Sequence, residues 1–306
     1  MTQQALGSKW AFRPREADSS HRFVVGLLGA GIRGSLTPRL HEVEADRLGL
    51  SYAYRIIDLD IIGQHAERSA ELVRRAAELG YDGLNVTHPS KQLVQEGLDD
   101  LSPDASILGA VNTITFHDGK AIGHNTDHIG FMGGFKAGLP FAATNSVVQI
   151  GAGGAGAAVA FGLLRAGTRH LVIADIEPAR AETLAARLAP HFPASDVSVT
   201  RTDSVAASLR EADGLVNSTP IGMAGHPGVP VDPALIHAGL WVADVVYRPL
   251  ETQLIKAARD RGCAVLDGGR MAVGQAVAAF ELFTGIRPDA DRMLDTFRDA
   301  VRLSTP

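Results

Sequence analysis

The feature that most constrains the fold is the glycine-rich stretch between residues 147 and 164, VVQIGAGGAGAAVAFGLL. Its length alone is compatible with a membrane span. The glycines, however, follow a short β-branched run and precede a stretch rich in helix-forming residues, which favours a strand, a tight turn and a helix. We therefore expect a buried βα unit here, and no contact with a membrane.

Gly151, Gly153 and Gly156 follow the G-x-G-x-x-G order of dinucleotide-binding turns. In such turns the first glycine permits the turn, the second lets a pyrophosphate approach the backbone, and the third lets helix and strand pack closely. The next strand, HLVIAD, ends at Asp175, where a ribose-binding carboxylate is expected. A carboxylate there accepts hydrogen bonds from a 2′-hydroxyl and repels a 2′-phosphate, so the sequence predicts NAD and makes NADP less favoured.

Two residues near the end of this second strand have alternative interpretations. Asp175 could be a turn or N-cap residue before Pro178 instead of a ribose ligand. Arg180 is the nearby residue whose charge opposes those of Asp175 and Glu177 and would admit NADP.

Composition narrows the classes of function. The chain has 306 residues, enough for two domains, and its formal net charge of −5 gives no basic excess for binding nucleic acid. Cys263 is the single cysteine, which excludes an intrachain disulfide and a cysteine-built metal site. We expect a cytoplasmic protein with a small-molecule substrate and no metal.

Strands alternate with helices along most of the chain, which predicts two α/β domains with largely parallel sheets. The first series contains RFVVGLLG, YAYRIID and YDGLNVT, and ends in a hairpin around residues 117–119. The second series contains SVVQI, HLVIADI, DGLVNSTP, LWVADVVY and CAVLDGG. Two helices at the C-terminus are expected to pack back on the first domain, and residues 1–21 form a polar tail.

The stretch NVTHPSKQ, residues 85–92, is the main candidate for chemistry in the first domain. Asn85, Thr87 and His88 lie at the carboxyl end of a strand, where ligands bind in open α/β sheets. A proline turn is then expected to lead into a helix that opens with Lys91. A solvated lysine is the alternative interpretation of Lys91.

Other polar residues lie at predicted helix starts or on predicted strands. Thr37 before Pro38 predicts an N-cap, and Ser35 with Thr37 also suits a carboxylate; both interpretations stay open. Asn125 and Asp127 lie at the domain junction, where a helix cap is the alternative. Asn112, predicted in a strand, needs a hydrogen-bond partner. Met271 and Gln275 share a helix face that could meet a ligand.

Eight motifs, in this order, resemble those of the shikimate/quinate dehydrogenase family: SLTP, NVTHPSKQ, AVNT, HNTD, GAGGAG, NSTPIGM, DVVY and GGRMAVGQA. They cover nearly the whole chain after residue 22. The resemblance implies a substrate domain at 22–126, completed by helices within 270–306, and a Rossmann-like cofactor domain at 127–269. It also implies reversible oxidation of a ring hydroxyl of quinate or shikimate, by a monomer or homodimer.

The resemblance also implies roles for individual residues. The catalytic pair is Lys91 and Asp127. Ser35 and Thr37 would hold a substrate carboxylate. Ring hydroxyls would be bound by Asn85, Thr87, Asn112, Asp127 and Gln275, with Tyr247 lining the pocket. Cofactor contacts are implied for Gly151, Ala152, Gly153, Gly154, Ala155, Gly156, Asp175, Arg180, Asn217, Ser218, Thr219, Val245, Gly268 and Met271.

Thr37 and Asp175 look more like the NAD-dependent quinate/shikimate branch than the biosynthetic NADP-dependent enzyme. Gly34, Ser90 and His128 depart from residues common in the family, which bears on substrate preference. Three alternatives remain: the NADP-dependent biosynthetic enzyme, an aminoshikimate-type dehydrogenase, and a non-catalytic NAD-sensing protein. A sensor would need neither Lys91 nor Asp127.

Overall fold

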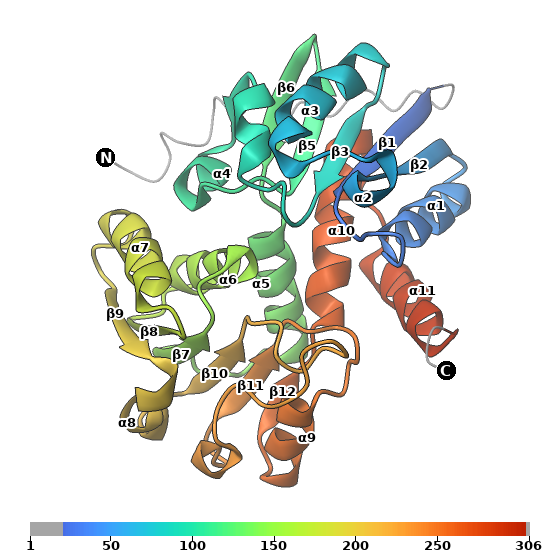
Figure 1. The fold of residues 1–306 in the computed structure, drawn as a ribbon. Helices are drawn as coiled ribbons and strands as arrows, with labels where there is room; N and C mark the ends of the chain where they lie inside the picture. The colour runs from blue at the N-terminus through green and yellow to red at the C-terminus, as the bar shows by residue number, and fades with distance from the viewer. Residues whose placement is uncertain (1–20, 304–306) are drawn as a thin grey trace. The chain divides into compact units, whose positions relative to one another are not determined.

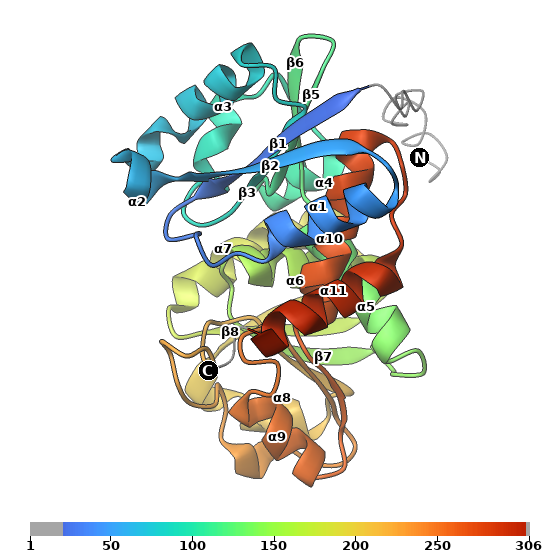
Figure 2. The same cartoon turned by 90° about the vertical axis from the view of Figure 1, so that its right-hand side faces the viewer.

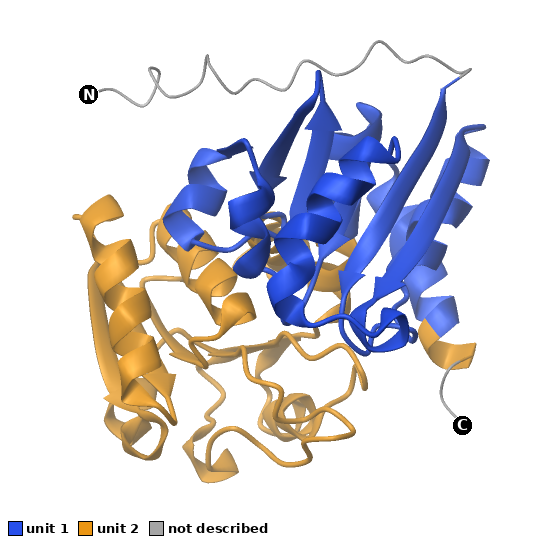
Figure 3. Cartoon of the chain, turned by 45° about the horizontal axis from the view of Figure 1, so that its top comes forward, with its two compact units in different colours: residues 1–126, 276–300 blue, residues 127–275, 301–306 orange. Residues whose placement is uncertain are grey.

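The computed structural model describes residues 21–303, which form two compact units. The first contains described residues up to Thr126 together with Ala276–Ala300, and the second contains Asp127–Gln275 with the described residues after Ala300 (Figure 3). Helix α10 (Gly269–Thr284) therefore contributes to both units. Each unit is an α/β structure with one six-stranded sheet, as the alternation of strands and helices predicts.

The sheet of the first unit is mixed, with the order β2-β1-β3-β5-β6-β4. Strands β1 (Arg22–Gly29), β2 (Ser51–Asp58) and β3 (Gly83–Val86) are parallel and lie side by side in Figures 1 and 2. Strands β5 (Thr113–His117) and β6 (Lys120–His124) form the predicted antiparallel hairpin. The carboxyl ends of these parallel strands lie on the same side of the sheet, and Asn85 lies near the carboxyl end of β3.

Helices and short helical turns join these strands. They are α1 (Thr37–Arg47), α2 (Leu59–Ile62), η1 (Ala66–Arg68), α3 (Ser69–Glu78), η2 (Leu93–Gly97) and α4 (Pro103–Leu108). One apolar cluster packs under the sheet around Leu28, Val73 and Ile114. Ala279 and Phe283 of α10 pack with Val25 and Leu27 of β1, so the C-terminal part of α10 belongs to the core of the first unit.

Several local predictions for the first unit are wrong. Strand β4 (Asp100–Leu101) lies beyond β6 in the sheet, so the hairpin is not the edge; β4 is too short to give a sequence pattern. Thr37 is the first residue of α1 and not its N-cap, which is Leu36; Ser35 Oγ accepts a hydrogen bond from Thr37 N at 3.3 Å. Asn112 precedes β5 and is not in the strand.

Lys91 does not open a helix, contrary to the prediction. It lies in a turn, and the 3-10 helix η2 begins two residues later. The Lys91 carbonyl accepts a hydrogen bond from Val111 N, just before β5, at 2.8 Å. In a regular helix this carbonyl would instead accept a hydrogen bond from an N–H group of the next helical turn. This backbone hydrogen bond therefore holds the turn against the segment that leads into β5.

The second unit has a fully parallel sheet with the order β12-β11-β10-β7-β8-β9. This is the order of dinucleotide-binding sheets, with β7 (Ser146–Ile150) and β10 (Gly214–Asn217) flanking the point where the order reverses. The remaining strands are β8 (His170–Asp175), β9 (Asp196–Arg201), β11 (Trp241–Asp244) and β12 (Ala264–Leu266). Strand β9, at the sheet edge, is missing from the sequence prediction.

Helices of the second unit follow its strands and cover its sheet (Figure 1). They are α5 (Asp127–Gly138), α6 (Gly154–Arg165), α7 (Pro178–Leu188), η3 (Ala189–His191), η4 (Thr202–Ser204), α8 (Ala206–Arg210), η5 (Pro233–Leu235) and α9 (Gln253–Asp260). The core gathers around Val148, Leu215 and Val242. Among the described residues, no helix is long and apolar enough to cross a bilayer.

Helix α11 (Ala290–Leu303) is fastened to α1 by a buried carboxylate. Glu44 is fully buried and accepts hydrogen bonds from Asp289 N and from the Arg292 guanidinium. A buried charge is tolerated only when it is paired and hydrogen-bonded, and both conditions are met here. Hydrogen bonds between residues far apart in sequence therefore hold α11 against α1 in the first unit.

Candidate functional site

The turn after β7 needs glycine at two positions for different reasons. Gly151 has φ +102°, a conformation that residues with a side chain rarely adopt. At Gly156 a Cβ atom would collide with the carbonyl oxygen of Gly151, so α6 approaches the end of β7 more closely than an alanine would allow. These are the demands that the sequence pattern predicts for the first and third glycines.

Gly153 is different, because a Cβ atom there would meet no protein atom within 4 Å. It is the N-cap of α6 and has no side-chain cap, and the first turn of the helix carries no acidic residue. The first turn of α6 therefore has room beside Gly153 and Gly154 and carries no side chain that caps or opposes an anion, and a helix N-terminus favours an anion through its N–H groups and dipole. The residues of this turn fit a dinucleotide pyrophosphate.

Two side chains hold the glycine turn by donating hydrogen bonds to backbone carbonyls in and beside it. Gln149 is buried in β7 and donates from Nε2 to the carbonyl oxygens of Gly151 (2.8 Å) and Gly156 (2.9 Å). Ser218, just after β10, donates to the carbonyl oxygens of Ile150 (2.8 Å) and Gly151 (2.9 Å). Gln149 was not among the residues predicted from the sequence. An amide inside an apolar central strand was the available signal, since burying one is costly without partners.

Asp175 lies at the end of β8 and is almost fully buried. One carboxylate oxygen accepts from Ala152 N at 2.8 Å, and the other accepts from Glu177 N at 2.9 Å. Asp175 is thus a turn residue, as the alternative interpretation has it, and it also fixes the glycine turn. Each oxygen accepts two hydrogen bonds when ionised, so capacity remains for a ligand hydroxyl.

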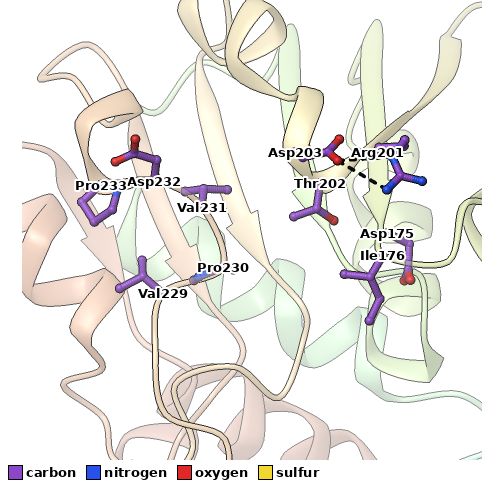
Figure 4. Close-up of a pocket in the computed structure, with 10 residues that line it drawn as sticks. All are labelled: Asp175, Ile176, Arg201, Thr202, Asp203, Val229, Pro230, Val231, Asp232 and Pro233. Carbon is purple, nitrogen blue, oxygen red and sulfur yellow. Dashed lines mark hydrogen bonds and ion pairs between the residues drawn. The ribbon is translucent and has the colours of Figure 1, made fainter.

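A pocket of about 630 Å³ opens beside Asp175 (Figure 4). Its lining comes from the ends of β8 and β9 and from the loop before η5: Asp175, Ile176, Arg201, Thr202, Asp203, Val229, Pro230, Val231, Asp232 and Pro233. The sequence analysis named only Asp175 among these. Arg180 is not in this lining; its guanidinium pairs with Glu177 at 2.9 Å on the surface.

Asn217 connects the ends of β10 and β11. Its Oδ1 accepts from Thr219 N (3.0 Å) and Oγ1 (2.7 Å), while Nδ2 donates to Asp244 Oδ1 (2.9 Å) and to the Ile221 carbonyl (3.0 Å). Asp244 also accepts from Val246 N (3.0 Å) and from Thr252 Oγ1 (2.7 Å). Burial raises the pKa of Asp244 to about 6, against the opposing effect of these hydrogen bonds.

The start of α10 is held by two close backbone approaches. A Cβ atom on Gly268 would meet the Val245 carbonyl, so the chain before α10 lies against the end of β11. A Cβ atom on Gly130 of α5 would lie 2.5 Å from Gln275 N and 2.6 Å from the Met271 carbonyl. Helices α5 and α10 therefore cross in close contact within the second unit, with Gly130 of α5 against Met271 and Gln275, and Gly134 of α5 against Arg270.

Two further predicted residues lie in this unit. Gln275 donates from Nε2 to the Ala272 carbonyl at 3.1 Å, an interaction within its own helix. Tyr247 follows β11 and is partly exposed, and burial of its ring raises the pKa of the phenol. His128 is buried with its ring edge-on to Phe161, at 5.0 Å between ring centroids. His128 therefore has a packing role in α5.

In the first unit, the predicted anion-binding hydroxyls lie together. Ser35 Oγ donates to Thr37 Oγ1 at 3.2 Å, beside the N-terminus of α1. Both residues are partly exposed. The capping interpretation of Thr37 is wrong, because Leu36 is the N-cap of α1. The anion-binding interpretation stays a prediction.

Asn85 and Asn112 belong to one buried hydrogen-bond network. Asn85 accepts from Tyr54 Oη (2.7 Å) and donates to Thr113 Oγ1 (3.2 Å). Asn112 accepts from Thr126 N (2.7 Å) and donates to Thr126 Oγ1 (3.0 Å). The partner that Asn112 needs is therefore Thr126. The network fixes the amide of Asn85 and the chain immediately before Asp127.

Lys91 and Thr87 lie in the turn after β3 and are both partly buried. Thr87 N bonds to the Leu28 carbonyl at 2.9 Å. Ser90, one of the departures from the family, is fully buried with its hydroxyl bonded to Ser69 Oγ at 2.7 Å. Asp127 is the first residue of the other unit, so its pairing with Lys91 belongs to the proposal below.

The parallel sheet, with a glycine turn at its switch point, places this chain in the Rossmann-like class of α/β proteins. Two family models match the chain: "Shikimate dehydrogenase substrate binding domain" over residues 27–114, and "Shikimate 5'-dehydrogenase C-terminal domain" over residues 269–296.

Relatives match over most of their length. A shikimate dehydrogenase (NADP(+)) of Streptomyces avermitilis is 56% identical over 89% of this chain and 94% of its own. A quinate/shikimate dehydrogenase (NAD(+)) of Corynebacterium efficiens is 46% identical over 90% of this chain and 97% of its own. The solved quinate dehydrogenase of Corynebacterium glutamicum in complex with NAD has a TM-score of 0.86 and 44% identity, covering 91% of this chain and 99% of that one. The chain belongs to the shikimate/quinate dehydrogenase family, whose members are oxidoreductases acting on CH–OH groups.

Asp244 predicts a specific dependence of stability on pH. Its folded pKa of about 6 lies above its ordinary value of 3.8, so between these values the folded protein holds a proton that the unfolded chain releases. Stability from this group is therefore lost as pH rises through that range. We expect wild type to lose about 2 kcal/mol relative to Asp244→Asn between pH 4.5 and 7.

Thermal unfolding of both proteins at the two pH values measures this change. The thermal midpoint of Asp244→Asn minus that of wild type should increase as pH rises. An equal difference in midpoint at both pH values would show that the Asp244 carboxyl titrates normally in the fold.

Proposed function

We propose that this chain catalyses the reversible, NAD-linked oxidation of a ring hydroxyl of quinate or shikimate to the corresponding ketone. The observation that carries the proposal is the glycine turn at the sheet's switch point, braced by a buried carboxylate, in a member of this family. In this proposal residues 127–269 bind the cofactor. Residues 22–126, with helices from 270–306, bind the substrate.

The cofactor would be held by the features described for the second unit. Backbone N–H groups at the start of α6, around Gly153 and Gly154, would bind the pyrophosphate. Asp175 would accept the ribose hydroxyls, and the loops containing Ser218 and Val245 would line the path toward Met271. When bound, the nicotinamide accepts or returns a hydride.

The substrate would be held by polar groups of the first unit and by helix α10. Ser35 and Thr37 would bind the carboxylate, and Asn85, Thr87 and Asn112 would bind ring hydroxyls. Gln275 and Tyr247 complete this set. The buried network around Asn85 supports this role because it holds the amide in one orientation before any ligand binds.

Lys91 would move the proton. During oxidation its neutral amine accepts the hydroxyl proton as the carbon loses a hydride, and during reduction the ammonium returns that proton. Asp127 would hold the lysine in position and bind the same region of the substrate. This division of roles separates proton transfer, done by the chain, from hydride transfer.

NAD is favoured over NADP by the environment of Asp175. A 2′-phosphate beside this carboxylate would experience about 4 kcal/mol of repulsion per pair of unit charges at contact and an effective dielectric near 20. The alternative is an NADP-dependent shikimate dehydrogenase, and the Streptomyces relative, named for NADP, favours it. Arg180, the cation that the sequence offers for NADP, lies outside the lining of the pocket beside Asp175 and pairs with Glu177.

One assay tests the function directly. The purified chain, given quinate or shikimate with NAD or NADP, should reduce NAD with at least one of the two substrates, which absorbance at 340 nm detects. We expect kcat/KM to be about tenfold or more higher with NAD than with NADP. Reversal of that ratio would establish the NADP alternative, and nucleotide binding without turnover would establish the sensor.

Replacing Lys91 tests the proton-transfer role. Lys91→Ala should lower kcat by about 10²-fold or more, because general acid–base catalysis contributes at least this factor. Lys120→Ala, an exposed lysine of the same unit, is the matched control and should leave kcat unchanged. Oxidation by wild type should also rise with pH. A flat kcat/KM between pH 6 and 10, or full activity in Lys91→Ala, would refute the role.

A further inference from the structure

Arg201 lines the pocket beside Asp175 and has no role in the function proposed above. Strands β8 and β9 pair in parallel with Asp175 directly opposite Arg201. Directly paired residues on neighbouring strands project from the same face of a sheet. Arg201 and Asp175 both line the pocket, and Figure 4 shows them on the same side of it.

The charge of Arg201 is engaged by its own neighbour. Both Nε and Nη2 of Arg201 lie 3.4 Å from Asp203 Oδ2. Ser204 Oγ donates to the other oxygen of Asp203 at 2.8 Å. These hydrogen bonds, the one from Ser204 first, lower the pKa of the Asp203 carboxyl, so it is ionised at neutral pH. The guanidinium therefore faces a charged partner.

The pocket as a whole is negative. Its described lining contains three carboxylates, Asp175, Asp203 and Asp232, and a single cation, Arg201. Its other walls are apolar: Ile176, strongly exposed for a large apolar residue, and Val229, Pro230 and Val231. Apolar walls suit a flat base, whereas the balance of charge opposes any added phosphate.

We propose that Arg201, neutralised by Asp203, is a specificity-determining residue at the adenosine ribose: the ion pair withholds from a 2′-phosphate the one cation of this pocket. This inference rests on the proposed function, because it places the adenosine end of the dinucleotide beside Asp175. Asp203 thus reinforces the discrimination made by Asp175 without itself touching the ribose.

Two nucleotide fragments test the proposal without catalysis. 5′-AMP and 2′,5′-ADP differ only in the 2′-phosphate, and calorimetry on the full chain gives the affinity of each. Asp203→Asn should tighten 2′,5′-ADP relative to 5′-AMP by about fivefold, the factor for one unit-charge pair at about 4 Å in a water-like dielectric. The double variant Arg201→Ala/Asp203→Asn should lose that gain.

Asp232→Asn is the matched control. It removes the same charge from the opposite wall of the pocket (Figure 4), and asparagine retains the capping of η5, where Asp232 accepts from Ala234 N at 2.8 Å. We expect its effect on the ratio of the two affinities to stay below about twofold. All three sites are exposed, and thermal midpoints verify that each variant folds.

The outcomes separate the inference from the function on which it rests. An unchanged ratio in Asp203→Asn, a gain that persists without Arg201, or an equal gain in Asp232→Asn would overturn the role of the ion pair while the nucleotide site stands. A wild type that binds neither fragment would overturn the nucleotide site itself, and with it the inference.

Discussion

The close approach of helix α6 to the end of strand β7 is the constraint on which the second unit depends. Gly156 touches the Gly151 carbonyl where no side chain fits, and Gln149 bonds to the carbonyls of both residues. Because the helix is held so close, its N-terminus lies at the carboxyl ends of the strands, at the switch point of the sheet. In the proposed function this helix N-terminus binds the pyrophosphate of the cofactor.

Buried carboxylates at the ends of β8 and β11 then hold the loops that follow these strands. Asp175 bonds to Ala152 N and Glu177 N, and Asp244 bonds to Asn217, which in turn holds Thr219. Each carboxylate is taken out of water only with hydrogen bonds to replace it. The result is a set of hydrogen-bonded loops at the carboxyl ends of the strands, an arrangement that favours preorganised binding.

The parts of this architecture that follow from local pattern are predictable from sequence. Alternating strands and helices give the fold class, and the order of glycines gives the turn, because each glycine has a separate steric cause. Thr37 and Lys91 show the limit: Leu36 takes the place predicted for Thr37 as N-cap of α1, and the Lys91 carbonyl binds Val111 N where a helix was predicted after Pro89. The partner of Lys91 comes from a distant part of the chain and leaves no periodic signal. Strand β9 was missed for a related reason, since an edge strand is only half buried, and Arg201 was missed with it.

The central claim is that open space at Gly153 admits a pyrophosphate to the backbone of α6. The most direct measurement is the affinity of Gly153→Ala for NADH, followed by fluorescence, with Gly133→Ala as control because a Cβ atom there also meets no protein atom within 4 Å. The account predicts that neither variant has a lower thermal midpoint than wild type, and that only Gly153→Ala binds NADH about tenfold or more weakly. Unchanged affinity in Gly153→Ala would contradict it.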